Sequence, residues 1–109
     1  MTEGEARAAL LAREEELARE DAANADSRDT VELQQDSVGR LSRMDAMQQQ
    51  AMAQAQERRR AQEKLRIKAA LERLDDGEWG YCTTCGEEIA EARLRHDPSV
   101  AVCVGCASG

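Results

Sequence analysis

The sequence has no phenylalanine and only one tryptophan, one tyrosine and one proline among its 109 residues. So few large apolar side chains exclude an ordinary globular core, and with it a large buried enzyme pocket. No apolar run approaches the roughly 20 residues that cross a membrane. Acidic residues follow Met1, where a signal peptide would be basic and then apolar. We therefore expect a cytoplasmic protein that is neither an enzyme nor membrane-bound.

Charge is unevenly distributed along the chain, whose formal net charge is −7. Residues 1–35 carry ten acids and four bases, whereas residues 40–76 carry six acids and nine bases. Opposite net charges favour two helices that lie side by side. An acidic protein lacks the basic surface that binds a phosphate backbone, so we expect no direct binding of DNA.

Residues 3–35 are expected to form a first long helix, because they consist mainly of Ala, Leu, Glu and Arg, with Thr2 available as N-cap. Residues 24–29 (NADSRD) are its weakest part. A kink there, or a new helix that begins at the capping-box sequence DTVE of residues 29–32, is the alternative. A stripe with seven-residue spacing follows one face: Leu10, Leu17, Asn24, Val31 and Val38.

Residues 36–44 (DSVGRLSRM) concentrate Asp, Ser and Gly, so we place the reversal of the chain, and the tip of a hairpin, there. Residues 45–76 contain no Pro or Gly and are expected to form a second long helix, with Ser42 or Asp45 as cap and Gly77 after its end. The stripe expected to face the first helix comprises Met47, Ala51, Ala55, Arg58, Gln62, Leu65 and Ala69.

These elements predict a mainly all-α protein in which residues 1–76 form an antiparallel two-helix coiled-coil hairpin. Such a hairpin buries too little surface to be very stable alone. We expect the segment that follows it, residues 77–109, to clamp its base. The apolar residues expected to pack there are Ile67, Leu71, Leu74 and Trp79.

All four cysteines lie in this last segment, in two CxxC pairs separated by 17 residues: Cys82, Cys85, Cys103 and Cys106. A two-residue gap lets both thiolates of a pair reach one ion, and two pairs complete the tetrahedral four-sulfur shell that suits zinc. A CxxC disulfide closes a strained short loop, and a redox motif needs one pair in a thioredoxin-like context. We therefore expect one structural zinc ion with no coordination position open for chemistry.

From Asp75 onward the sequence DDGEWGYCTTCGEEIAEARLRHDPSVAVCVGC resembles the DksA/TraR C4-type zinc-finger family. The shared pattern is an acidic helix end, an aromatic-Gly-Tyr before Cys82 and CGxxI after it. An Arg-Leu pair, a Pro and an apolar residue before Cys103 continue the match. The helical arm that precedes the cysteines resembles the family in architecture.

The resemblance implies a regulator of bacterial transcription that binds RNA polymerase directly. It inserts the tip of its coiled coil into the secondary channel to modulate initiation, in concert with the alarmone ppGpp. The chain begins at the first arm helix, so the extra N-terminal segment of longer family members, and the family's ppGpp contacts, are not carried over. The family's DxxDxA-like tip pattern is not reproduced. The candidate partner-binding residues at the tip are Asp36, Arg40, Arg43, Asp45 and Ala46.

The transcription regulator is expected to be a monomer, and two other interpretations stay open beside it. The spacing CxxC-x17-CxxC is also that of GATA-type DNA-binding fingers, which use a basic segment after the last Cys, whereas here three residues follow Cys106. A coiled-coil adaptor that merely uses zinc as a staple fits the same composition. At the tip, a helix cap is the purely structural role for Asp45, and solubility is that for Arg40 and Arg43.

Overall fold

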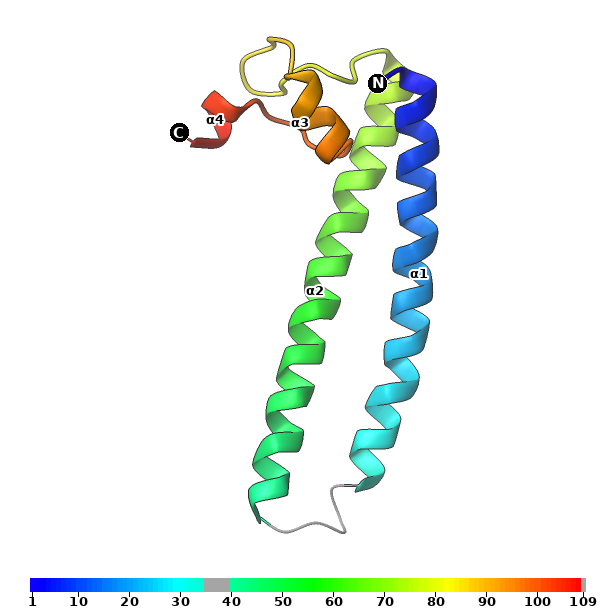
Figure 1. The fold of residues 1–109 in the computed structure, drawn as a ribbon, viewed down its shortest axis with the longest axis vertical. Coiled ribbons are helices and arrows are strands. Elements are labelled where there is room, and N and C mark those ends of the chain that lie inside the picture. Colours follow the sequence, from blue (N-terminus) through cyan, green and yellow to red (C-terminus); the bar gives the residue numbers. More distant parts are fainter. Residues whose placement is uncertain (35–39, 109) are drawn as a thin grey trace. The chain divides into compact units, whose positions relative to one another are not determined.

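A computed structural model describes residues 1–34 and 40–108 of the chain, with the side chains of residues 1–24 and 43–108 (Figure 1). The prediction of a mainly α-helical protein is confirmed. The helices, in order, are α1 (Glu3–Gln34), α2 (Arg40–Asp76), α3 (Glu91–His96) and α4 (Val104–Ser108). The chain divides into two compact units, the first made of Met1–Glu14 and Glu63–Gly109 and the second of Glu15–Gln62. The first unit thus joins helix ends to the cysteine segment, rather than separating from the arm at residue 77.

Helix α1 begins where the sequence predicts. The Thr2 hydroxyl oxygen accepts a hydrogen bond from a backbone N–H of the first turn at 3.1 Å, as an N-cap does. The helix runs unbroken to Gln34, so a new helix beginning at Asp29 is wrong. The side-chain amide of Asn24 donates to the carbonyl of Glu20 at 2.7 Å, which satisfies this donor within α1.

In the first unit the two long helices run antiparallel. The guanidinium of Arg7 lies 2.7 Å from the Asp75 carboxylate. Two nitrogens of Arg13 donate to the two oxygens of Glu63, at 2.7 and 3.1 Å. As the residue number rises on α1 it falls on α2, which defines the direction. The bonds from Arg13 hold the pKa of Glu63 below its ordinary value.

In the second unit an ion pair takes the place of an apolar contact between the helices. The Nε of Arg60 donates to Asp21 at 2.6 Å, and the Arg60 side chain is only 10% exposed. Leu17 is fully buried nearby in sequence on α1. The charge asymmetry of the sequence is therefore realised as a part-buried pair as well as more exposed ones.

The seam of α2 differs from the expected one. Residues at seven-residue spacing line it: Ala46 and Ala53 are half-buried, and Arg60, Ile67 and Leu74 are buried. Seven residues of α2 were expected to face α1. This prediction is wrong for five of them, which are exposed, and the other two are half-buried. The exposed members are Met47, Ala51, Arg58, Gln62 and Leu65, and the half-buried ones are Ala55 and Ala69.

The expected and the observed stripes of α2 both have helical spacing, so periodicity alone could not show which of them faces α1. The contacts of each stripe with the rest of the protein decide this. The observed stripe brings Arg60 to Asp21 and buries Ile67 and Leu74 in the same unit as Trp79. On α1 the predicted stripe is correct for Leu10 and Leu17, which are buried, while the side chains of Val31 and Val38 lie outside the described residues.

Helix α2 begins at Arg40, five residues before the expected start, so the second half of the expected tip is helical. Ser42 and Asp45 are therefore helical residues and not caps; their lower helix propensity costs under about 1 kcal/mol each, which the good helix formers around them tolerate. The helix ends at Asp76, as predicted. Gly77 has φ +74°, and the N–H of Glu78 donates to the carbonyl of Arg73 at 2.8 Å, which forms a Schellman motif.

The base packing expected from the sequence is present. Ile67, Leu74 and Trp79 are buried and Leu71 is half-buried. The indole N–H of Trp79 donates to the carbonyl of Pro98 at 3.0 Å, which satisfies its only polar atom. Among the described residues, no helix is long and apolar enough to cross a membrane.

The observed seam makes a direct prediction for stability. Ile67→Ala should lower the free energy of unfolding by about 2–5 kcal/mol, because it empties a fully buried site. The matched control is Leu65→Ala, at a side chain that is 68% exposed, and it should change stability by less than about 0.5 kcal/mol. Chemical denaturation of the zinc-loaded protein, followed by circular dichroism, measures both. Equal losses in the two variants would contradict the observed seam.

Candidate metal centre

The first CxxC pair lies in a tight loop that a β-bridge closes. Tyr81 pairs with Glu88 in an antiparallel bridge, and the N–H of Cys82 donates to the carbonyl of Glu87 at 2.8 Å. Inside the loop, the backbone N–H groups of Thr84 and Cys85 point at the Cys82 sulfur, at 3.4 and 3.5 Å. These amides stabilise negative charge on that sulfur, as a metal-binding knuckle requires.

A glycine is required directly after this pair. Gly86 has φ +79°, a conformation that residues with a Cβ rarely adopt. Its N–H donates to the carbonyl of Cys82 at 2.9 Å and so closes the knuckle. The backbone conformation at Gly86 therefore explains why a glycine follows the cysteine in the pattern CGxxI. The Ile of the same pattern, Ile89, is buried, with 5% of its surface exposed.

The second pair lies at the start of the short helix α4. Cys103 precedes this helix and Cys106 lies in its first turn, and the carbonyl of Cys103 accepts the N–H of Ala107 at 2.9 Å. The two knuckles are tied together by Thr83, whose N–H and hydroxyl both donate to the carbonyl of Ala101, at 2.8 and 3.2 Å. This link holds the first cysteine pair against the segment that leads into the second cysteine pair.

Two arginines support the approach to the second pair. The Nε of Arg93, on α3, donates to the carbonyl of Val102 at 3.0 Å, directly before Cys103. Arg73, on α2, reaches the carbonyl of Val100 at 3.5 Å, and burial lowers its pKa from the ordinary value. Sequence reasoning gave Arg73 no role, since nothing in its neighbourhood marks a contact 27 residues away; the Arg-Leu pair of the family pattern was the available signal for Arg93.

The four cysteine sulfurs fit one zinc ion. All four lie within 4.8 Å of one another, and the Sγ atoms of Cys85 and Cys103 are 3.7 Å apart. A regular tetrahedron with Zn–S bonds of about 2.3 Å has S–S edges of about 3.8 Å. The described residues hold no other group of three or more His, Cys, Asp or Glu side chains placed in this way.

Crowding of four thiols sets their protonation before metal binds. Bonds from the backbone N–H groups of Cys85 and Cys103 lower the pKa of Cys82 to about 6. The neighbouring cysteine side chains raise the pKa of Cys106 to about 12. A bond from the backbone N–H of Glu87 lowers the pKa of Cys85, but the Cys82 side chain, burial and the Cys103 side chain together outweigh it, so this pKa is also raised. The packed thiols therefore favour a state in which only one of them is ionised to a thiolate. A divalent cation is needed to stabilise four thiolates together.

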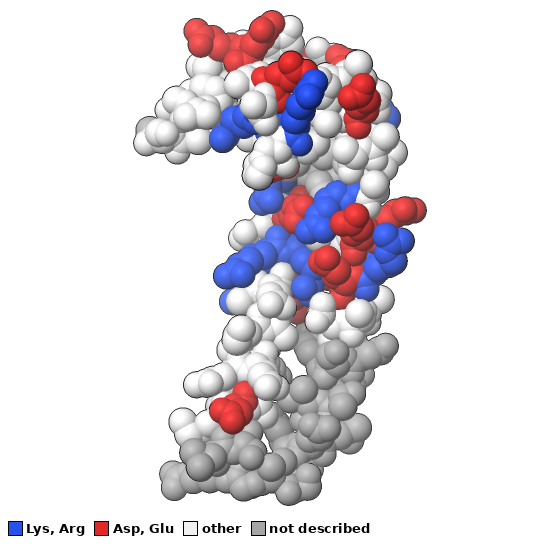
Figure 2. All heavy atoms as spheres, in the orientation of Figure 1, with Lys and Arg blue, Asp and Glu red and all other residues white. Residues whose placement is uncertain are grey.

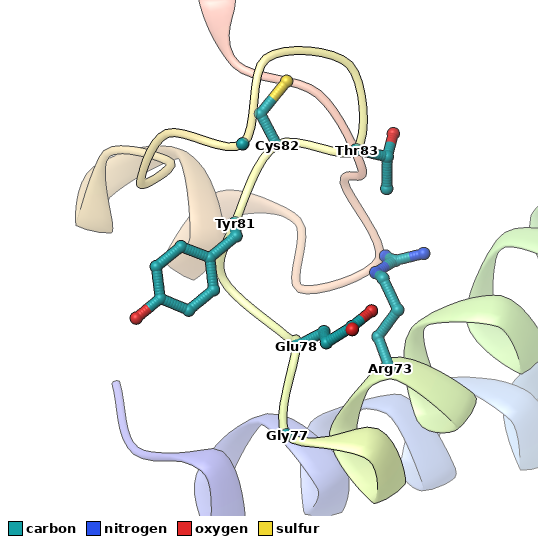
Figure 3. A pocket seen from close by; sticks show the side chains of 7 residues that line it. Arg73, Gly77, Glu78, Tyr81, Cys82 and Thr83 are labelled. Carbon is teal, nitrogen blue, oxygen red and sulfur yellow. The ribbon is translucent and has the colours of Figure 1, made fainter.

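A small hollow lies beside the first knuckle (Figure 3). Its volume is about 340 Å³, and Figure 3 shows the Cys82 sulfur directed away from Arg73 and Glu78, with the Tyr81 ring on the opposite side from Arg73. The hollow is lined by Arg73, Gly77, Glu78, Tyr81, Cys82, Thr83 and Gly86.

A closed four-sulfur shell leaves the zinc ion no coordination position for a substrate. The metal centre therefore has a structural role.

The structure describes only part of the candidate tip. Asp36 and the side chain of Arg40 lie outside the described residues. Arg43 and Asp45 are exposed on α2, and Ala46 is half-buried on the seam side. Because Asp45 lies six residues into α2, its interpretation as a helix cap is wrong.

The comparisons with known proteins concern mainly the C-terminal third. Residues 77–109 match the family described as "Prokaryotic dksA/traR C4-type zinc finger". Over 41 residues the chain is 44% identical to the RNA polymerase-binding transcription factor DksA of Haemophilus influenzae, and 37% identical to that of Escherichia coli K12. An uncharacterized protein of Aquifex aeolicus is 46% identical over 41 residues. Each match covers 38% of this chain and 27–28% of the relative, so the chain matches under a third of their length.

The fold comparison extends over nearly the whole chain. The structure of transcription factor DksA2 from Pseudomonas aeruginosa superposes with a TM-score of 0.81, covering 97% of this chain and 80% of that one. At 23% identity this likeness shows the fold, a coiled-coil hairpin with a cysteine module. The expectation of zinc is confirmed, because the four cysteines are positioned for one metal ion within a C4-type zinc finger.

Removal of one ligand should release the metal and unfold the module. Cys82→Ser or Cys103→Ser leaves three thiolates, and structural zinc contributes on the order of 10 kcal/mol to small domains. We expect loss of zinc by metal analysis and loss of helical circular-dichroism signal. The matched control is Thr84→Ser, between two ligands, which should keep both. An unchanged spectrum for the cysteine variants, or for the wild type with chelator, would contradict this role.

Zinc binding should release protons and weaken in acid. At pH 7 thiols with the ordinary pKa of about 8.5 are mostly protonated in an unfolded, metal-free module, and the raised pKa values of Cys85 and Cys106 keep these two protonated wherever the fold persists, so at least two protons should leave on binding. Where the fold persists, Cys82 also protonates below about pH 6, and affinity should fall more steeply. Isothermal titration calorimetry in two buffers of different ionisation enthalpy counts the protons. Release of fewer than one proton at pH 7 would rule out this account of the thiols.

Proposed function

We propose that this chain, which carries a C4-type zinc finger of the DksA/TraR family, regulates bacterial transcription by binding RNA polymerase directly. Its coiled-coil tip enters the secondary channel and modulates initiation. The observation that carries the proposal is the combination of the family's finger at residues 77–109 with a DksA2-like fold over 97% of the chain. The matched relatives of Haemophilus influenzae and Escherichia coli are named RNA polymerase-binding transcription factors, which supports the choice of partner.

In this proposal the finger, in the first unit, is structural and the candidate tip, in the second unit, is functional. Zinc holds the base, where Ile67, Leu74 and Trp79 are buried. Asp45 is exposed and is not needed as a cap, so its carboxylate is available to a partner or to a magnesium ion in the polymerase. Arg43 is exposed two residues away and is suited to an acidic group of the partner. Asp36, Arg40 and Ala46 complete the proposed contact.

The structure supports this role over that of a DNA-binding finger. Only two bases lie in the segment of the finger, and both are already bonded. Arg93 donates to the carbonyl of Val102, and Arg95 pairs with Glu91 at 3.0 Å. Since phosphate contacts supply most of non-specific DNA affinity, we propose that the protein acts on polymerase without contacting DNA. It is then a cytoplasmic, non-enzymatic monomer, acting with ppGpp where the polymerase binds it.

A zinc-stapled adaptor remains the second candidate, and binding to purified polymerase distinguishes the two. The zinc-loaded chain should bind RNA polymerase core enzyme in the absence of DNA. It should shift only weakly any DNA fragment offered without polymerase. Tight, salt-sensitive DNA binding would favour the GATA-like alternative, and absence of polymerase binding would favour the adaptor.

The tip residue has a specific test. Asp45→Asn should keep the circular-dichroism spectrum of the wild type, because its side chain is exposed, but weaken the effect on transcription in vitro by about fivefold or more, equivalent to about 1 kcal/mol. The matched control is Asp76→Asn, at an exposed aspartate at the other end of α2, which should behave as wild type. A wild-type effect from Asp45→Asn would move the functional carboxylate elsewhere, with Asp36 next.

A further inference from the structure

One face of α2 in the second unit is apolar although it points to solvent. Met44, Met47 and Met52 are 58%, 64% and 63% exposed. With the exposed residues Gln48 and Ala51 they occupy positions i, i+3, i+4, i+7 and i+8 of the helix. This is the spacing of a helix stripe that packs against a partner. These five residues, Met44, Met47, Gln48, Ala51 and Met52, are called the methionine stripe below.

The methionine stripe does not serve the hairpin itself. The residues of the same segment that face the seam are half-buried and lie at other helical positions: Ala46, Gln50, Ala53 and Glu57. On a helix with 3.6 residues per turn, the stripe is centred on the side opposite to them. Three methionines therefore remain in water in a position where a solvated helix ordinarily carries charge.

Beyond Asp45, charge is absent from the stretch that carries the rest of the stripe. Residues 46–56 contain no Asp, Glu, Lys or Arg, whereas eight of the next twelve residues, 57–68, are charged. On the face drawn in Figure 2, the described surface next to the grey residues is largely white apart from one red patch, and most blue and red side chains lie farther from the grey residues. Protein interfaces are depleted in charged residues at their centre and enriched in Met, which adapts its shape to a partner.

We propose that the methionine stripe is a docking surface that continues the tip and packs into an uncharged, apolar groove of RNA polymerase. This inference rests on the proposed function and extends its contact by two helical turns. We choose RNA polymerase as the partner because the stripe is continuous with the candidate tip residues. Met44 directly precedes Asp45, and Met47 directly follows Ala46. A second copy of the chain is disfavoured, since five residues fall far below the roughly 20–30 a side of a stable interface. The stripe is thus one part of a larger contact.

The test uses the full zinc-loaded chain and purified RNA polymerase core enzyme. Met47→Glu places a carboxylate in the proposed apolar contact and should lower affinity by about tenfold or more. Met47→Leu, which keeps an apolar side chain of similar size, should bind polymerase with an affinity within about twofold of wild type. The matched control is Gln49→Glu, which adds the same charge at an exposed residue about 120° around the helix from the centre of the stripe. It should also bind within about twofold of wild type.

A photo-crosslinking residue in place of Met47 should join the chain to a polymerase subunit, and the same residue at Gln49 should not. Circular dichroism confirms that all variants keep their helices. If the wild type does not bind polymerase, the proposed function fails and this inference with it. If the wild type binds while Met47→Glu binds equally well, only the inference fails. Crosslinking of position 47 to a second copy of the chain would assign the stripe to self-association and overturn the proposal.

Discussion

The constraint on which the rest of the structure depends is the convergence of four thiolates on one ion. The segment after Gly77 contains two short helices and one β-bridge, and its buried apolar side chains are few: Trp79, Cys82, Ile89 and Leu94. Chains of this size seldom bury enough surface to fold without a metal or disulfide. Zinc supplies free energy on the order of 10 kcal/mol, comparable to the whole stability of an ordinary domain. The metal is therefore what gives the first unit a fixed core for the helix ends.

The second unit is held by weaker means. Among the described residues its seam on α2 contains alanines and the part-buried ion pair of Arg60 with Asp21, where a stable coiled coil would place leucines. Such a pair adds little net stability but makes misalignment costly, because a slipped register leaves the buried guanidinium of Arg60 without its carboxylate. Such a seam sets the register of two helices while leaving the outward face of α2 free for another task. That face carries Asp45 and the methionine stripe.

The sequence predicted the parts of this fold that depend on local chemistry. Cysteine spacing identified the metal centre, Gly77 marked the end of α2, and Leu10 and Leu17 identified the buried face of α1. The outward and inward faces of α2 were exchanged, because alanine and arginine recur at helical spacing on both, and only the partner helix decides between them. The start of α2 was placed too late for a related reason.

Ser and Asp between residues 36 and 45 have the composition of a turn, yet from Arg40 onward they are accommodated in a helix. Asp45 therefore lies within the helix as an exposed carboxylate and does not cap it. The exchange of the two faces places Met47 and other residues expected in the seam on an uncharged surface in solvent. The contacts of Arg73 and Arg93 with the loop before Cys103 depend on tertiary structure and had no local signal of comparable strength.

The central claim is that zinc holds the first unit together and that the candidate tip residues and the methionine stripe, in the second unit, bind RNA polymerase. Hydrogen exchange of the zinc-loaded chain, alone and with polymerase core enzyme, tests it most directly. The account predicts slower exchange in residues 43–56 on binding, and exchange in residues 77–108 that is unchanged by polymerase but accelerated by chelation of zinc. Protection confined to residues 77–108, or none in either segment, would contradict it.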